Sequence, residues 1–152
     1  MRLRRCTPFL FALALLGCGT AGDSHYSELT IGDDVLRVER ADTPAERQQG
    51  LSGRPSLPPG EGLLLIFETA DYHAIWMKGM QFDIDIVWIR DGRIVNITPN
   101  VPHVTGTEPL TIYRPAAPVD AVLEVVAGEA TRRHWKYGMS VRLENEDSVQ
   151  AR

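Results

Sequence analysis

The chain has 152 residues, with 20 acidic side chains, 16 lysines and arginines, and a formal net charge of −4. This acidic balance argues against nucleic-acid binding, because phosphate recognition draws on clustered lysine and arginine. The length is enough for one hydrophobic core and too short for two, so a single domain is expected.

Residues 1–17 have the order of a bacterial export signal. Three arginines lie among the first five residues, and an apolar run from Pro8 to Leu16 follows. This run is shorter than the roughly 20 residues that a membrane-spanning helix needs. The sequence Leu15-Leu16-Gly17-Cys18 is similar to a lipobox, which predicts cleavage before Cys18 and lipidation of that cysteine. An ordinary secretory signal cut near Gly19 to Gly22, with Cys18 lost, is the alternative.

The predicted mature protein is a cell-envelope lipoprotein that faces the periplasm. Its membrane contact is the lipid anchor, and Gly19 after the cysteine resembles the pattern of lipoproteins sent to the outer rather than the inner membrane. Residues 18–27 are small and polar and would form a tether. With Cys18 assigned to lipid, no cysteine remains for a structural disulfide, so burial must hold the fold.

Strand-length runs and turn signals dominate the first half of the domain. Leu29 to Ile31 and Val35 to Arg40 flank a turn sequence, which is typical of a hairpin. The segment from Thr43 to Gly50 predicts a short helix, with a threonine cap, proline in the first turn, a capping-box glutamate and a terminal glycine. Leu63 to Phe67 is a continuous apolar run, which predicts a strand covered on both faces.

The second half continues this pattern, with Asp91-Gly92 as the strongest hairpin signal in the chain. The prediction is a mainly β single domain over residues 28–143, either a β-sandwich or a jelly-roll-like barrel with one or two short helices. Its expected later elements are strand-like segments at 72–77, 82–90, 93–98, 121–126 and 139–143, a loop at 99–109, a helix at 129–137 and a loose tail at 144–152.

The strand from Phe82 to Arg90 carries charges inside an apolar stretch. Because side chains alternate along a strand, Asp83 and Asp85 share one face, and the other face is apolar core. Aspartate is disfavoured in strands, so this pair requires compensation. Gly79 permits a bend that would bring Lys78 beside the two acids.

Two interpretations of these charges stay open. In the first, Lys78, Asp83 and Asp85 form a half-covered polar pocket walled by Trp76 and Tyr72, with mutually shifted pKa values. In the second, both acids face solvent on an exposed sheet face, and the lysine is an ordinary surface residue.

Several spaced motifs occur in a defined order and carry a family resemblance. They are Thr43-Pro44-Ala45-Glu46-Arg47, Gly50-Leu51-Ser52-Gly53-Arg54, Gly62-Leu63-Leu64-Leu65-Ile66-Phe67, Trp76-Met77-Lys78, Asp85-Ile86-Val87-Trp88-Ile89 and Val122-Leu123-Glu124-Val125. With them the chain resembles the DUF192 family, also called UPF0127, small and often exported domains of uncharacterised function. The resemblance implies a jelly-roll-like β-sandwich. It also implies that this chain has the family's usual residues at Arg54, Lys78, Asp85 and Glu124. Family members usually have Asn-Thr where this chain has Gly79-Met80.

The favoured function is a non-catalytic binding module for a small polar or anionic ligand. The predicted ligand-binding residues are Lys78, Asp85, Arg54, Trp76, Asp83 and Tyr72. The alternatives are a cell-envelope hydrolase that uses Lys78, Asp83 and Asp85 as acid and base, and a scaffold for another envelope protein. No metal or other cofactor is expected, because the histidines, His25, His73, His103 and His134, lack ligand-like spacing.

Overall fold

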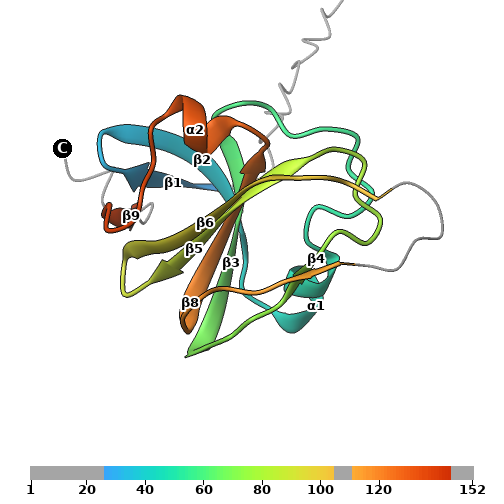
Figure 1. Cartoon of the computed structure of the whole chain (residues 1–152), viewed down its shortest axis with the longest axis horizontal. Coiled ribbons are helices and arrows are strands. Elements are labelled where there is room, and N and C mark those ends of the chain that lie inside the picture. Colours follow the sequence, from blue (N-terminus) through green and yellow to red (C-terminus); the bar gives the residue numbers. More distant parts are fainter. Residues whose placement is uncertain (1–25, 105–110, 145–152) are drawn as a thin grey trace, which may run out of the picture.

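The computed structural model describes residues 26–104 and 111–144 (Figure 1). The predicted signal peptide, Cys18 and most of the tether lie outside the described residues, as do residues 105–109 of the predicted loop and nearly all of the tail. Within the described ranges, no helix has the length and apolar character needed to cross a membrane.

One curled sheet organises the described residues. Its seven strands lie in the order β6-β5-β8-β3-β2-β1-β9, and a second sheet pairs β4 with β7. The elements are β1 (Tyr26–Ile31), β2 (Asp34–Ala41), α1 (Pro44–Gln49), β3 (Glu61–Asp71), β4 (Ile75–Trp76), β5 (Ile84–Arg90), β6 (Arg93–Val101), β7 (Ile112–Tyr113), β8 (Val119–Val126), α2 (Glu129–Arg132) and β9 (Val141–Glu144).

Local sequence signals account for the first connections. β1 and β2 pair antiparallel around a tight turn at Gly32, as the hairpin pattern predicts. Thr43 and Glu46 form the predicted capping box of α1, and Gly50 ends the helix with a positive φ of 51°. Because α1 carries the chain from one end of β2 back to the other, β3 pairs with β2 in parallel. This parallel pair was not predicted, since hairpin signals report only antiparallel neighbours.

The sheet curls until its two outer strands meet at one end. Arg93 at the start of β6 bridges to Ser140 just before β9, and the amide of Val141 donates to the carbonyl of Gly92 over 2.8 Å. In Figure 1, β9 accordingly lies beside the turn that joins β5 and β6. The mainly β prediction with two short helices is confirmed, and the observed form is a half-barrel with a small additional sheet.

Both faces of the central strands are covered. On β5, Ile84, Ile86 and Trp88 belong to one buried cluster, while Val87 and Ile89 belong to the other. The second cluster fills the concave side of the curled sheet with residues of β1, β2 and β9. The first cluster includes Leu51 after α1 and Ile75 of β4. The face with α1 and β4 is the one that holds the site described next.

Some predicted elements have different lengths. The segment 72–77 contributes only the two residues of β4, and the predicted helix at 129–137 is only the single turn of α2. β6 extends to Val101, three residues beyond the predicted end, because its last residues still pair with Ile84 of β5. β7 was not predicted, since two residues of strand carry no periodic signal.

Candidate functional site

The predicted pair of Lys78 and Asp85 is not formed. Asp85 is completely buried on β5 and accepts hydrogen bonds from three backbone amides. The amides of Asn100 and Gly128 donate to Oδ1 over 2.8 and 3.1 Å, and the amide of Ala130 donates to Oδ2 over 2.9 Å. These bonds cap the start of α2 and hold the end of β6, so the compensation that Asp85 requires comes from backbone N–H groups. The expectation of a neighbouring lysine was wrong.

The Lys78 side chain is exposed and forms no ion pair within the described part of the chain. Its backbone contributes instead, because its carbonyl oxygen accepts a hydrogen bond from Ser52 Oγ over 2.6 Å. The amide of Gly53 donates in turn to the carbonyl of Gly79 over 2.8 Å. The turn at Lys78 and Gly79 is therefore bonded to the loop that follows α1.

The other predicted charged residues are also separated. Asp83 is exposed and accepts from the backbone amide of His103 over 2.9 Å and contacts its ring Nδ1 at 2.5 Å, and these contacts lower the pKa of Asp83. Arg54 pairs with Glu39 through two contacts of 2.8 and 2.9 Å. Tyr72 is half exposed, and its carbonyl accepts from Arg114. The predicted polar pocket therefore does not assemble from these residues.

A different cavity lies between α1, β4 and the central strands. Its volume is about 170 Å³. The lining is mostly apolar, with polar groups contributed by α1 and by one buried carboxylate. The lining residues are Arg47, Gln48, Gln49, Gly50, Leu51, Ser52, Leu65, Phe67, Ala74, Ile75, Trp76, Met80, Ile84 and Glu124. Of the predicted ligand-binding residues, only Trp76 belongs to this set.

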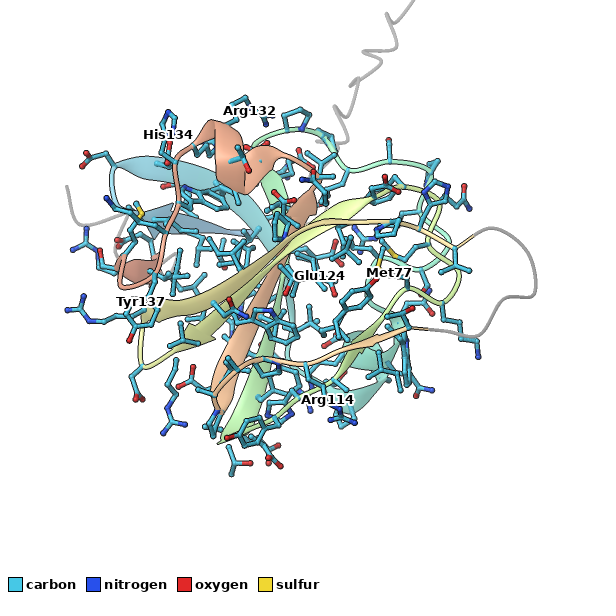
Figure 2. All side chains as sticks on the ribbon, in the orientation of Figure 1. Met77, Arg114, Glu124, Arg132, His134 and Tyr137 are labelled. Carbon is cyan, nitrogen blue, oxygen red and sulfur yellow. The ribbon has the colours of Figure 1, made fainter. Side chains whose placement is uncertain are left out.

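Glu124 is the polar group at the base of this cavity. It lies on β8 between Leu63 of β3 and Ile86 of β5, in the middle of the apolar cluster on this face. Figure 2 places it near the centre of the molecule. It is 5% exposed, and its carboxyl group has no hydrogen bond or salt bridge within the described residues. Every fully enclosed side-chain oxygen or nitrogen atom of the described residues has a hydrogen-bond partner. Because the Glu124 oxygens have none, they are not fully enclosed, and they open onto the cavity that Glu124 lines.

Burial governs the ionisation of Glu124. Loss of hydration raises its pKa from 4.5 to about 7, and the charge of Arg54 opposes part of this rise. The carboxyl group therefore titrates near neutral pH. A buried titratable group with a shifted pKa that faces a cavity is a typical feature of a functional site.

Arg47 is the other charged residue of the lining, and it is already engaged. Its guanidinium donates to the carbonyl oxygens of Asp42 and Ile66, the latter over 2.8 Å, and lies over the ring of Phe67. His73 stacks on the same ring, with ring centroids 3.6 Å apart. These contacts fix one wall of the cavity and leave Glu124 without a partner cation.

Sequence reasoning noticed Glu124 only through the family resemblance and did not assign it to the site. A usable signal was present. The run from Ala121 to Val126 is apolar except for this one acid, and continuous apolar runs indicate strands covered on both faces. An acid inside such a strand must be buried on one face or the other.

A second cavity, of about 350 Å³, lies on the concave side of the sheet. Its lining is apolar apart from Asp120, which already accepts from the amide of Asp91 over 3.0 Å and lies 3.7 Å from Arg90. Asp120 is partly exposed and already has a cation beside it, so this cavity holds no buried, unpartnered acid like Glu124. The described residues also contain no group of three or more His, Cys, Asp or Glu side chains that could hold a metal ion.

Comparisons with known proteins agree with this fold. A search of curated proteins finds no match. A crystal structure of a protein of unknown function from Novosphingobium aromaticivorans DSM 12444 is 30% identical, with a TM-score of 0.71 over 77% of this chain and 84% of that chain. A candidate transcription regulator from Sinorhizobium meliloti 1021 is also 30% identical, with a TM-score of 0.70 over 80% of this chain and 98% of that one.

The family comparison covers the whole described domain. The model of the DUF192 family, described as an uncharacterized ACR, matches residues 27–143. This range begins within β1 and ends within β9, so it includes every strand of the half-barrel and both helices. The chain therefore belongs to the DUF192 family.

Proposed function

We propose that this domain is a non-catalytic binding module that takes one small molecule in the cavity between α1 and β4. The observation that carries the proposal is the Glu124 carboxyl group, which is almost fully buried, has no protein partner in the described residues and opens onto that cavity. Leaving a buried polar group without a partner costs about 1–3 kcal/mol. A ligand that bonds to Glu124 would recover this free energy.

The size and walls of the cavity define the body of the ligand. A cavity of about 150 Å³ is enough to hold benzene, and the cavity here measures about 170 Å³. Phe67, Trp76 and Met80 contribute apolar and aromatic surface around it. A ligand with one ring or a short branched chain, and one polar group directed at Glu124, fits this arrangement.

The geometry gives less support to an anionic ligand or to catalysis. An anion would need the charges of Lys78 and Arg54, but the lysine points to solvent and the arginine is paired with Glu39. The hydrolase alternative needs Lys78, Asp83 and Asp85 in one place, and Asp85 is saturated by backbone amides. A binding role for the single carboxyl group of Glu124 is therefore favoured.

A fragment-binding experiment tests the proposal. Benzyl alcohol, benzylamine and benzoate are added in turn to the isotope-labelled protein, and the indole N–H signal of Trp76 is followed by NMR. At least one fragment should shift this signal. Ala74→Leu, which adds bulk at an exposed residue of the cavity lining, should abolish the shift. Ala45→Leu, on the exposed surface of α1 outside the lining, should preserve it. Absence of any shift, or a shift that survives Ala74→Leu, refutes the binding cavity.

The proposed location is the periplasmic side of the cell envelope, on the outer membrane, with lipid on Cys18 as the anchor. Its support is the order of basic, apolar and small residues over positions 1–19. The full chain produced in a bacterial host should take up radiolabelled palmitate and sediment with membranes, whereas a Cys18→Ala chain should do neither. Unlabelled wild-type protein in the soluble fraction would refute the anchor.

A further inference from the structure

We infer that the ligand of this cavity carries an ammonium group, which binds between the carboxylate of Glu124 and the backbone carbonyl oxygen of Arg47. The inference rests on the proposed binding function, and it adds the chemical class of the ligand. The polar end of the cavity offers oxygen acceptors. The two arginines near it, Arg47 and Arg54, already bind other groups of the protein.

Gly50 lies beside two oxygen acceptors at the polar end of the cavity. A Cβ atom built on Gly50 would lie 3.8 Å from the carbonyl oxygen of Arg47 and 3.9 Å from Oε2 of Glu124. Two oxygen acceptors from distant parts of the chain therefore lie on either side of Gly50, a lining residue without a side chain, so a ligand group in the cavity can approach both. The positive φ of 51° also favours glycine at this position. An ammonium group has three N–H donors and no acceptor, which suits a space bounded by oxygens.

The arginines near Glu124 are bound to other groups of the protein, and the Glu124 carboxylate has no partner. Arg54 lies near enough to lower its pKa, but the guanidinium is bound by both oxygens of Glu39. Glu39 adds a second negative charge on the same side of the sheet, two strands away across Leu63. From α1, Arg47 directs its guanidinium to the carbonyls of Asp42 and Ile66. A cation that pairs with Glu124 must therefore come from the ligand.

The remaining walls suit the rest of an amine. Phe67 and Trp76 supply aromatic surface, and Leu65, Ile75, Met80 and Ile84 supply aliphatic surface. Aromatic faces attract nearby cations and also pack against a ring. A primary amine on a single ring, or on a short aliphatic chain, satisfies both ends of the cavity.

Binding of an ammonium group would be linked to a proton. The carboxylate form of Glu124 attracts the ammonium, and the protonated form does not. Since burial raises the pKa of the free site to about 7, an acidic solution protonates Glu124 and competes with the amine. Affinity should therefore rise between pH 5.5 and pH 7.5, by about tenfold or more, because each pH unit below the pKa reduces the carboxylate fraction about tenfold.

Calorimetric titrations with benzylamine and the uncharged benzyl alcohol test the inference. Benzylamine should bind more tightly than benzyl alcohol at pH 7.5, and its affinity should fall at pH 5.5. Glu124→Gln should weaken benzylamine at least tenfold, remove the pH dependence and weaken benzyl alcohol far less, because the glutamine amide still bonds to a hydroxyl group. Asp120→Asn is the matched control, because Asp120 lies on the same strand outside this cavity, and it should change neither ligand.

The outcomes separate this inference from the proposed function. If benzyl alcohol or benzoate shifts the Trp76 signal and binds as tightly as benzylamine, the cavity is a binding site and the ammonium inference is wrong. Benzylamine binding that does not depend on Glu124 or on pH also overturns it. If no fragment binds at all, the proposed function fails together with the inference.

Discussion

The two buried carboxylates of the central strands, Asp85 and Glu124, have opposite surroundings. They lie on neighbouring strands, where Asp85 pairs with Val125 and Glu124 pairs with Ile86. Asp85 faces the concave side of the sheet and is surrounded by the amides of Asn100, Gly128 and Ala130. Glu124 faces the α1 side and has no donor within the described residues.

This difference shows that burial alone does not mark a binding residue. Both acids are at least 95% inaccessible to solvent. A carboxylate with three amide donors is satisfied by the fold, and its role is structural. A carboxylate with none destabilises the fold unless it is protonated or binds something else. The number of unused bonding positions therefore separates a structural acid from a candidate site.

The largest expected effect is the loss of the structural acid. Asp85→Asn removes the negative charge and directs an amide group at backbone donors, so it should lower the free energy of unfolding by about 4 kcal/mol. Urea unfolding measures this change. Asp83→Asn is the matched control, since this exposed acid is two residues away, just before β5, and it should cost less than about 1 kcal/mol. Similar losses for the two variants would contradict the structural role of Asp85.

Replacing Glu124 should stabilise the protein, whereas replacing Asp85 should destabilise it. A pKa raised from 4.5 to about 7 means that the folded state binds the proton more tightly than the unfolded chain does. The resulting penalty is absent below pH 4.5, grows between pH 4.5 and 7 and is complete above pH 7, where it reaches about 3 kcal/mol. Glu124→Gln removes the ionisation, so it should stabilise the ligand-free protein at pH 8 and do so much less at pH 4.5. Thermal unfolding across this range provides the measurement. A variant that is less stable than the wild type at pH 8 would show that the carboxylate is satisfied.

The sequence predicts the strands better than it predicts the site. Capping at Thr43, the turns at Gly32 and Gly92 and the alternation along β5 depend on neighbouring residues, so local patterns identify them. The partners of Asp85 are 15, 43 and 45 residues away, and all three are backbone amides. Backbone amides are the same in every sequence, so no residue pattern distinguishes them. A lysine seven positions away was therefore the natural but incorrect prediction. The cavity at Glu124 likewise depends on α1 and β4 meeting over β8, a contact between distant segments.

A smaller effect should follow from changing the surroundings of Glu124. Arg54 lowers the pKa of Glu124 through its charge, without direct contact. Arg54→Gln should therefore raise this pKa above about 7, while the loss of its partly exposed pair with Glu39 should cost at most about 1 kcal/mol of stability. A carbon-13 NMR titration of the Glu124 carboxyl group measures the change. Arg37→Gln is the control, because Arg37 pairs with Glu61 and its charge is not among the causes that shift the pKa of Glu124. A lower pKa in Arg54→Gln would contradict the assigned electrostatics.

Replacing Lys78 should give the smallest effect, and it tests whether this lysine pairs with Asp85. The side chain is exposed and the contacts of this residue are made by its backbone, so Lys78→Ala should change the free energy of unfolding by less than about 0.5 kcal/mol. Lys136→Ala, at another exposed lysine, gives the reference value. If Lys78 were the partner of Asp85, its removal would leave a buried charge uncompensated and cost about 3–5 kcal/mol. The gap between these values is wide enough for one urea titration of each variant to decide the role of Lys78. Either the lysine pairs with the buried acid, or it only binds Ser52 of the loop after α1 through its carbonyl oxygen.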